Sequence, residues 1–109
     1  MIANLSGTPK RLSQMAIGST STTLYTSQPD GKTAILDIMV VNTTSASINL
    51  TMYIGSAASG NEFGWYQTPI PAKTSVQYSG YQILNQNESL LALGSAVGLT
   101  ASISGVERV

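Results

Sequence analysis

Apolar and polar residues alternate along several short segments of this chain, as they do in strands that bury one face. The alternation is clearest over residues 48–54, where Asn49, Thr51 and Tyr53 separate four large apolar side chains. A period of two places successive side chains on opposite faces of a strand. We therefore predict a half-buried strand over 48–54. A second is predicted over 97–106, with the odd-numbered residues from Val97 to Gly105 forming its buried face.

The remaining segments also favour strands over helices. Residues 34–41 are apolar on both faces except at Asp37, which indicates a strand covered on both sides. Turn-forming segments such as Pro29-Asp30-Gly31 and Pro69-Ile70-Pro71 recur between the apolar segments. Short strand patterns separated by recurring turns predict an all-β fold, a single β-sandwich or jelly-roll-like domain of about eight strands. The weaker predicted strands are 11–17, 22–26, 74–79, 81–84 and 89–93.

The first twenty residues differ from the rest, since they are polar and rich in Gly, Ser and Thr. Such a segment cannot form a core of its own. We expect an extended N-terminal arm over 1–20 and a sandwich domain over 21–109, although 11–17 also has a strand pattern. Our hypothesis is that the arm lies across a neighbouring subunit or another protein partner.

The amino-acid composition excludes more classes of function than any motif does. The chain has 109 residues, of which 42% are hydrophobic and only 9% charged, and it lacks both His and Cys. A domain of this size builds one core, and charged residues normally make up about 25% of a soluble domain. Without His or Cys, the usual general bases, thiolate ligands and disulfides are missing. We predict no catalytic residues, no cofactor and no metal, and hence a protein that is not an enzyme.

Charge and hydropathy also argue against two kinds of partner. Five basic and five acidic residues give a formal net charge of zero. Nucleic-acid binding needs a dense basic face, which scattered charges do not provide. No segment reaches the roughly 18 consecutive apolar residues of a membrane span. We therefore expect neither a nucleic-acid partner nor a membrane partner, and a soluble chain made in the cytoplasm.

Six residues are the candidates for contact with a partner. Phe63, Trp65 and Tyr66 form the densest aromatic group, which could be a lid on the core, a protein interface or a glycan contact. Asp37 interrupts an apolar strand, and it could pair with a lysine, cap a backbone group or face a neighbouring chain. Lys10 and Arg11 belong to the predicted arm and complete the set.

Several segments together resemble a recurrent small β-sandwich protein of tailed bacteriophages. The similarity spans residues 10–108 and consists of turns and strand patterns. Members of this group are virion structural proteins, either head decoration or cement proteins or small tail-associated subunits. The resemblance implies an assembly role and brings no catalytic residues. The segments that carry it are Leu24-Tyr25-Thr26, Pro29-Asp30-Gly31-Lys32-Thr33-Ala34-Ile35-Leu36, Val40-Val41-Asn42-Thr43-Thr44, Ile70-Pro71-Ala72-Lys73-Thr74, Asn85–Glu88 and Thr100–Glu107.

The function expected from the resemblance is that of a capsid decoration or cement protein in the virion. Its partner would be the major capsid protein or another virion protein. It would also associate with itself, as a trimer by analogy with known decoration proteins. The alternative is a tail-associated adhesin or receptor-binding module, in which Trp65 and Tyr66 contact a host glycan.

Overall fold

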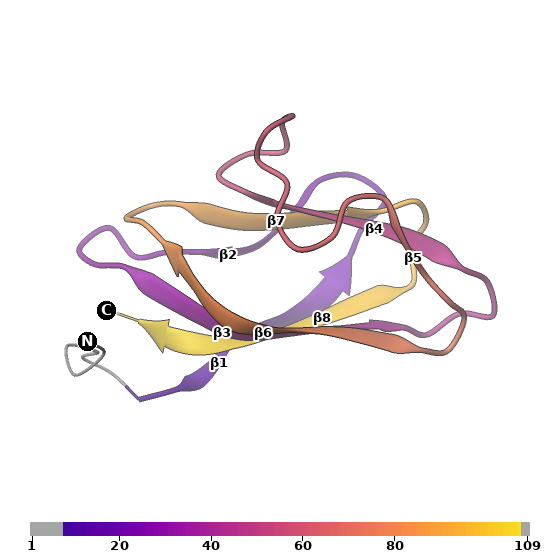
Figure 1. Ribbon diagram of the computed structural model, residues 1–109, viewed down its shortest axis with the longest axis horizontal. Coiled ribbons are helices and arrows are strands. Elements are labelled where there is room, and N and C mark those ends of the chain that lie inside the picture. Colours follow the sequence, from indigo (N-terminus) through magenta and orange to yellow (C-terminus); the bar gives the residue numbers. More distant parts are fainter. Residues whose placement is uncertain (1–7, 108–109) are drawn as a thin grey trace.

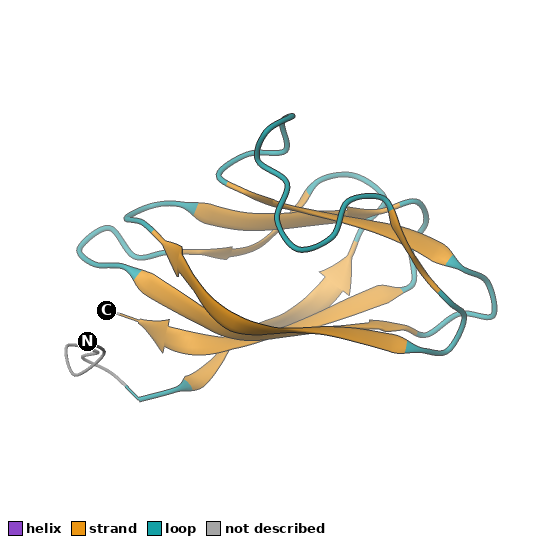
Figure 2. Ribbon diagram, in the orientation of Figure 1, coloured by secondary structure: helices purple, strands orange, loops and turns teal. Residues whose placement is uncertain are grey.

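Two antiparallel sheets of four strands each pack face to face in the computed structural model (Figures 1 and 2). The structure describes residues 8–107, and within them the chain forms eight strands and no helix. This confirms the predicted all-β sandwich. The first sheet has the order β1 (Lys10–Ile17), β8 (Leu99–Glu107), β3 (Thr33–Asn42), β6 (Ser75–Leu84). The second has the order β2 (Thr22–Thr26), β7 (Ser89–Gly94), β4 (Ile48–Ile54), β5 (Thr68–Ile70).

This strand order is that of a jelly roll, in which two Greek keys are folded into two facing sheets. Its loops gather at two ends of the sandwich. Gly94 N–H donates to the Gly18 carbonyl across one end, and Ser27 N–H donates to the Glu88 carbonyl across the other. The second end holds the β2–β3 and β6–β7 loops and the start of the β4–β5 loop, together with the start of β1 and the end of β8 (Figure 1).

Aliphatic side chains from both sheets fill the space between them. The predicted alternation in β4 is confirmed, because Ile48, Leu50 and Met52 are buried. In β8, Leu99, Ala101 and Ile103 are buried as expected. Burying one such large aliphatic side chain contributes about 1.5–3 kcal/mol, so these strands supply much of the stability. The core cluster consists of Ile17, Leu24, Ile35, Ile38, Val40, Ile48, Leu50, Met52, Ile70, Leu84, Leu90, Ala92, Leu99, Ala101 and Ile103.

The last predicted strand, 97–106, begins two residues before β8 does. Val97 is 70% exposed and lies in the β7–β8 loop, so the prediction that it begins the buried face was wrong. Gly98, with φ of 129°, separates it from the strand. A positive φ interrupts an extended strand, which explains why the alternation continues in the sequence but not in the structure.

Two short segments of the middle region also differ from the prediction. The predicted strands 74–79 and 81–84 are one strand, β6, with a bulge: Gln82 pairs with Ile35 and Ser79 with Asp37. Residues 68–70, expected as part of a turn, form the edge strand β5. Pro69 is compatible with that position because an edge strand does not need every N–H in the ladder.

Most of the predicted N-terminal arm that the structure describes belongs to the sandwich. Lys10–Ile17 forms β1 and pairs with β8 from Lys10↔Gly105 to Ile17↔Leu99. Ile17 is buried and Leu12 packs partly against the core, so this segment adds apolar contacts despite its polar composition. The boundary expected at residue 20 therefore does not coincide with the edge of the sandwich. Residues 1–7 of the expected arm lie outside the described residues.

Candidate functional site

The aromatic group divides into two parts with different surroundings. Phe63 contacts Tyr78 of β6 edge to face, with ring centroids 5.0 Å apart and planes at 71°. Phe63 and Trp65 both pack against the core, whereas Tyr66 is 58% exposed. Phe63 N–H donates to the Met52 carbonyl at 2.8 Å, which holds this segment along β4. Phe63 and Trp65 thus close one side of the sandwich as a lid, and Tyr66 is the aromatic residue open to a partner.

Asp37 lies on the outer face of the first sheet. Its carboxylate accepts hydrogen bonds from Gln77 Nε2 at 2.6 Å and Ser79 Oγ at 3.1 Å, both on β6. A bulge in β3 between Ile35 and Asp37 explains the sequence pattern. Because the bulge inserts an extra residue, Ile35 and Ile38 both enter the core although three positions separate them. Asp37 therefore points away from the core and orders two side chains at the edge of the sheet.

Lys10 and Arg11 interact with residues of their own chain. Lys10 Nζ lies 2.6 Å from Glu107 Oε1, and the two side chains are 56% and 31% exposed. Arg11 Nη1 donates to Gln14 Oε1 at 2.9 Å. Exposed ion pairs of this kind contribute only about 0–1 kcal/mol. The two residues are on β1, at the edge of the first sheet, whereas Phe63, Trp65 and Tyr66 follow β4 of the second. The structure does not unite the six candidates in one site.

A polar cluster that the sequence did not predict joins the two sheets. Tyr25 of β2 donates its hydroxyl to Glu107 Oε2 of β8 at 2.5 Å and lies 3.1 Å from Thr33 Oγ1 of β3. Thr33 is fully buried, and its hydroxyl also lies 3.0 Å from Ser27 Oγ. Burial, followed by the hydrogen bond to Glu107, raises the pKa of Tyr25 to about 12. The cluster is a structural clamp, because each member bonds to another.

A second polar clamp is centred on Asn42 at the end of β3. The Asn42 side chain is buried, and its Nδ2 donates to the Ala46 carbonyl at 2.8 Å and the Ile70 carbonyl at 2.9 Å. Its Oδ1 accepts from Thr44 N–H at 2.9 Å and Thr44 Oγ1 at 2.7 Å. All its polar atoms are satisfied, as burial requires. The segment Val40–Thr44, which carries part of the phage resemblance, therefore has a structural role.

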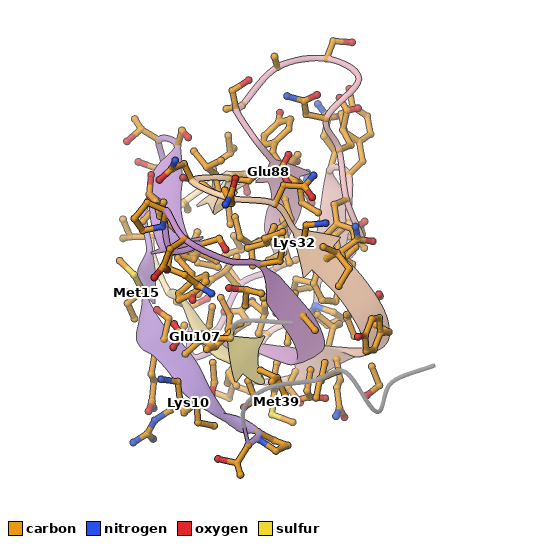
Figure 3. All side chains as sticks on the ribbon, turned by 90° about the vertical axis from the view of Figure 1, so that its left-hand side faces the viewer. Lys10, Met15, Lys32, Met39, Glu88 and Glu107 are labelled. Carbon is orange, nitrogen blue, oxygen red and sulfur yellow. The ribbon has the colours of Figure 1, made fainter. Side chains whose placement is uncertain are left out.

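A surface groove of about 390 Å³ lies between the β4–β5 loop and the β6–β7 turn, and Glu62 and Glu88 line it. Glu62 accepts a hydrogen bond from Gly60 N–H at 3.0 Å, and Glu88 accepts one from Asn85 N–H at 2.9 Å. Both carboxylates thus cap the backbone of their own turns. Among residues 8–107 no group of three potential metal ligands is present. Figure 3 shows Glu88 with Lys32 at this end of the sandwich.

The largest regular surface is the outer face of the first sheet, which we call the outer panel. Strand pairing places its residues in three rows across β1, β8, β3 and β6. Only Arg11 and Asp37 in the panel are charged, and both are in one row. Met39, 38% exposed, is near the centre and points away from the sandwich (Figure 3). The rows are Arg11, Ser104, Asp37, Ser79; Gln14, Ser102, Met39, Gln77; and Ala16, Thr100, Val41, Ser75.

Comparison with models of known protein families finds no match for this chain, and comparison with curated proteins finds none either. The similarity to small phage sandwich proteins therefore stays a prediction from the sequence. Within the described residues, no helix has the length and apolar character needed to cross a membrane.

Proposed function

We propose that this chain is a non-enzymatic structural subunit of a tailed bacteriophage virion, and in the first place a decoration or cement protein of the head. The outer panel is the observation that carries the proposal. It is a sheet face of four strands whose side chains are mostly uncharged and polar, with an exposed methionine near its centre and its two charges in one row. Protein interfaces are depleted of charge at their centres, and such a face can be covered without burying unpaired charges.

The candidate chemical groups of the chain add support because they are engaged in structural contacts. Glu107 accepts a hydrogen bond from Tyr25 and pairs with Lys10, and Asp37 accepts a hydrogen bond from Gln77 of β6. In the proposed role each copy lies with its panel against the shell and contacts more than one shell subunit. Detachment then requires several contacts to break together, which strengthens retention beyond the strength of any single contact.

The panel can be tested with heads assembled without this protein and mixed with the purified chain. Met39→Glu places a charge at the centre of the panel, where contact with the shell would remove it from water. We expect its binding in cosedimentation to be weaker than that of the natural chain by about tenfold or more. Thr23→Glu, at an exposed position of β2 in the other sheet, is the matched control and should bind normally. Equal binding by both variants, or no binding by the natural chain, would reject the panel as the contact surface.

The exposure of Tyr66 favours a second candidate, a tail-associated adhesin that contacts host glycan. An exposed aromatic ring can stack on the apolar face of a sugar. Tyr66→Ala removes this ring, whereas Trp65→Ala would also disturb packing against the core. Glycan-array binding that is lost in Tyr66→Ala would favour the adhesin. An array on which the natural chain binds no glycan would remove this candidate.

A further inference from the structure

Each sheet has two edge strands, and three of the four edges carry features that discourage pairing with another chain. β1 begins with Lys10 and Arg11 and has a bulge between Arg11 and Ser13. β2 has five residues and a bulge, and β5 has three residues with Pro69 in the middle. Charges, bulges, proline and short length are the usual devices that protect an edge.

The fourth edge, β6, lacks most of this protection. It has ten residues without a charge or a proline, and its bulge at Gly80 and Tyr81 leaves Ser75–Ser79 as a regular stretch. No backbone hydrogen bond beyond those to β3 involves this stretch among the described residues. An uncharged, regular edge of this kind favours pairing with another strand.

The ladder between β3 and β6 determines which backbone groups remain open. Asn42 N–H donates to the Thr74 carbonyl at 2.8 Å, so these opposite residues form a hydrogen-bonded pair. Such pairs alternate with non-hydrogen-bonded pairs along an antiparallel ladder. Val76 and Tyr78 therefore bond to β3, while the N–H and C=O groups of Ser75, Gln77 and Ser79 point toward the free edge. The side chains of these three residues are all exposed.

We propose that β6 pairs with β6 of a second copy of this chain, antiparallel and about a twofold axis at Gln77. In this register Gln77 faces Gln77 of the second copy, and Ser75 faces Ser79. Each copy contributes three residues, and each of these has one free N–H and one free C=O group. Together they form six main-chain hydrogen bonds, and none of these groups is left unpaired. The two first sheets become one continuous sheet of eight strands, and the two outer panels become one surface.

The side chains suit this register on both faces of the new sheet. On the inner face, Val76 of each copy comes opposite Tyr78 of the other, and pairs of β-branched and aromatic side chains stabilise antiparallel sheets. On the outer face, Asp37 of each copy already holds Gln77 through its Nε2 at 2.6 Å. No like charges oppose each other within the five paired residues.

This inference deepens the proposed function, since a decoration subunit that joins two panels covers a wider part of the shell. It leads to a dimer in place of the trimer expected by analogy. The tests use the purified chain without heads. If the chain is monomeric, the pairing through β6 is wrong, but the chain can still bind heads. If the chain does not bind heads, the proposed function is wrong, but the pairing can still hold.

The first test compares two substitutions of an exposed glutamine by lysine. Gln77→Lys brings two positive charges together at the axis, and Gln14→Lys places the same charge on β1 at the opposite edge of the same sheet. In sedimentation velocity at rising concentration, we expect the natural chain and Gln14→Lys to approach twice the 11.4 kDa of one chain. Gln77→Lys should raise the dissociation constant by about tenfold or more. A natural chain that stays monomeric, or two variants that behave alike, would overturn the proposal.

The second test uses the absence of cysteine from the sequence. In a hydrogen-bonded antiparallel pair, opposite Cα atoms are about 5.5 Å apart, within the range that a disulfide spans. Gln77→Cys should therefore form a covalent dimer on mild oxidation, with Gln14→Cys as the control that forms little. Equal cross-linking of the two variants would contradict pairing at Gln77. Circular dichroism of every variant checks that the fold is retained.

Discussion

At the scale of single residues, the polar groups with the most specific surroundings hold the fold together. Tyr25, Thr33 and Glu107 come from three strands and connect the second sheet to the first. Buried hydroxyls and carboxylates are costly unless each finds a partner. In a jelly roll, the two sheets otherwise meet mainly through aliphatic side chains, which attract without fixing a direction. The cluster therefore helps to set how the two sheets are aligned at this end.

Tyr25→Phe removes the hydroxyl while keeping the ring. We expect the free energy of unfolding to fall by about 1–3 kcal/mol, because Glu107 and buried Thr33 each lose a neighbour. Urea unfolding followed by circular dichroism measures the change. Tyr81→Phe, at an exposed position, is the control and should change stability little. Equal effects of the two substitutions would show that the Tyr25 hydroxyl does not stabilise the fold.

The same hydroxyl should make the free energy of unfolding depend on pH in the alkaline range. The pKa of Tyr25 rises from 10.0 to about 12 in the folded chain, chiefly through burial. Between these values the unfolded chain releases the phenol proton while the folded chain keeps it, so stability should decrease as pH rises from 10 to 12. The natural chain and Tyr25→Phe are each titrated and followed by ultraviolet absorbance. The difference between the two curves should show one phenol with a pKa near 12. A difference curve centred at 10 would contradict this environment.

At the scale of strands and loops, residue patterns predicted the fold class and most strands. The period of two in β4 and β8 follows from burial of one face, which the sequence displays directly. The bulges could not be predicted from the sequence. The extra residue in β3 between Ile35 and Asp37 is recognised only from the pairing of β3 with β8. The partner of Tyr25, 82 positions away, was equally hidden. Local patterns record burial, while pairing and clamps depend on residues far apart in the chain.

One glycine in β8 illustrates a constraint that the alternation alone does not explain. A Cβ built on Gly105 would lie 2.1 Å from the Ala34 carbonyl oxygen, so any side chain must displace the backbone of β3. We expect Gly105→Ala to lower the free energy of unfolding by about 2–4 kcal/mol, an overpacking effect at the upper end of the usual range. Ser104→Ala, on the outer face beside it, should have a small effect. Chemical denaturation distinguishes the two, and near-equal stabilities would contradict the close approach of β8 to β3.

The aromatic lid gives a second prediction at this scale. Phe63→Ala removes the ring that contacts Tyr78, and we expect a loss of about 2–4 kcal/mol in the free energy of unfolding. Tyr66→Ala, three residues later, should have little effect on stability because its ring is exposed. Thermal unfolding of the two variants tests the division. A strongly destabilised Tyr66→Ala together with a stable Phe63→Ala would reverse the roles assigned to these residues.

At the scale of the whole molecule, the structure shows how the few charged residues are placed on the first sheet. The sequence has 9% charged residues, and the structure shows that the two charges of the outer panel, Arg11 and Asp37, lie in one row and leave the other two rows uncharged. The six predicted contact residues do not form one site, because interface candidates chosen by type carry no information on which face they occupy. The panel could be found only after the register of four strands was known. Its two uncharged rows and the open edge of β6 both favour association with proteins.

If the chain is the proposed cement protein, its association should stabilise a phage head. The measurement is the melting temperature of heads assembled without the protein, before and after saturation with the purified chain. We expect the natural chain to raise the melting temperature, and Met39→Glu to raise it less than Thr23→Glu does. Heads that fail to bind the chain, or that bind it and melt at an unchanged temperature, would contradict a cementing role.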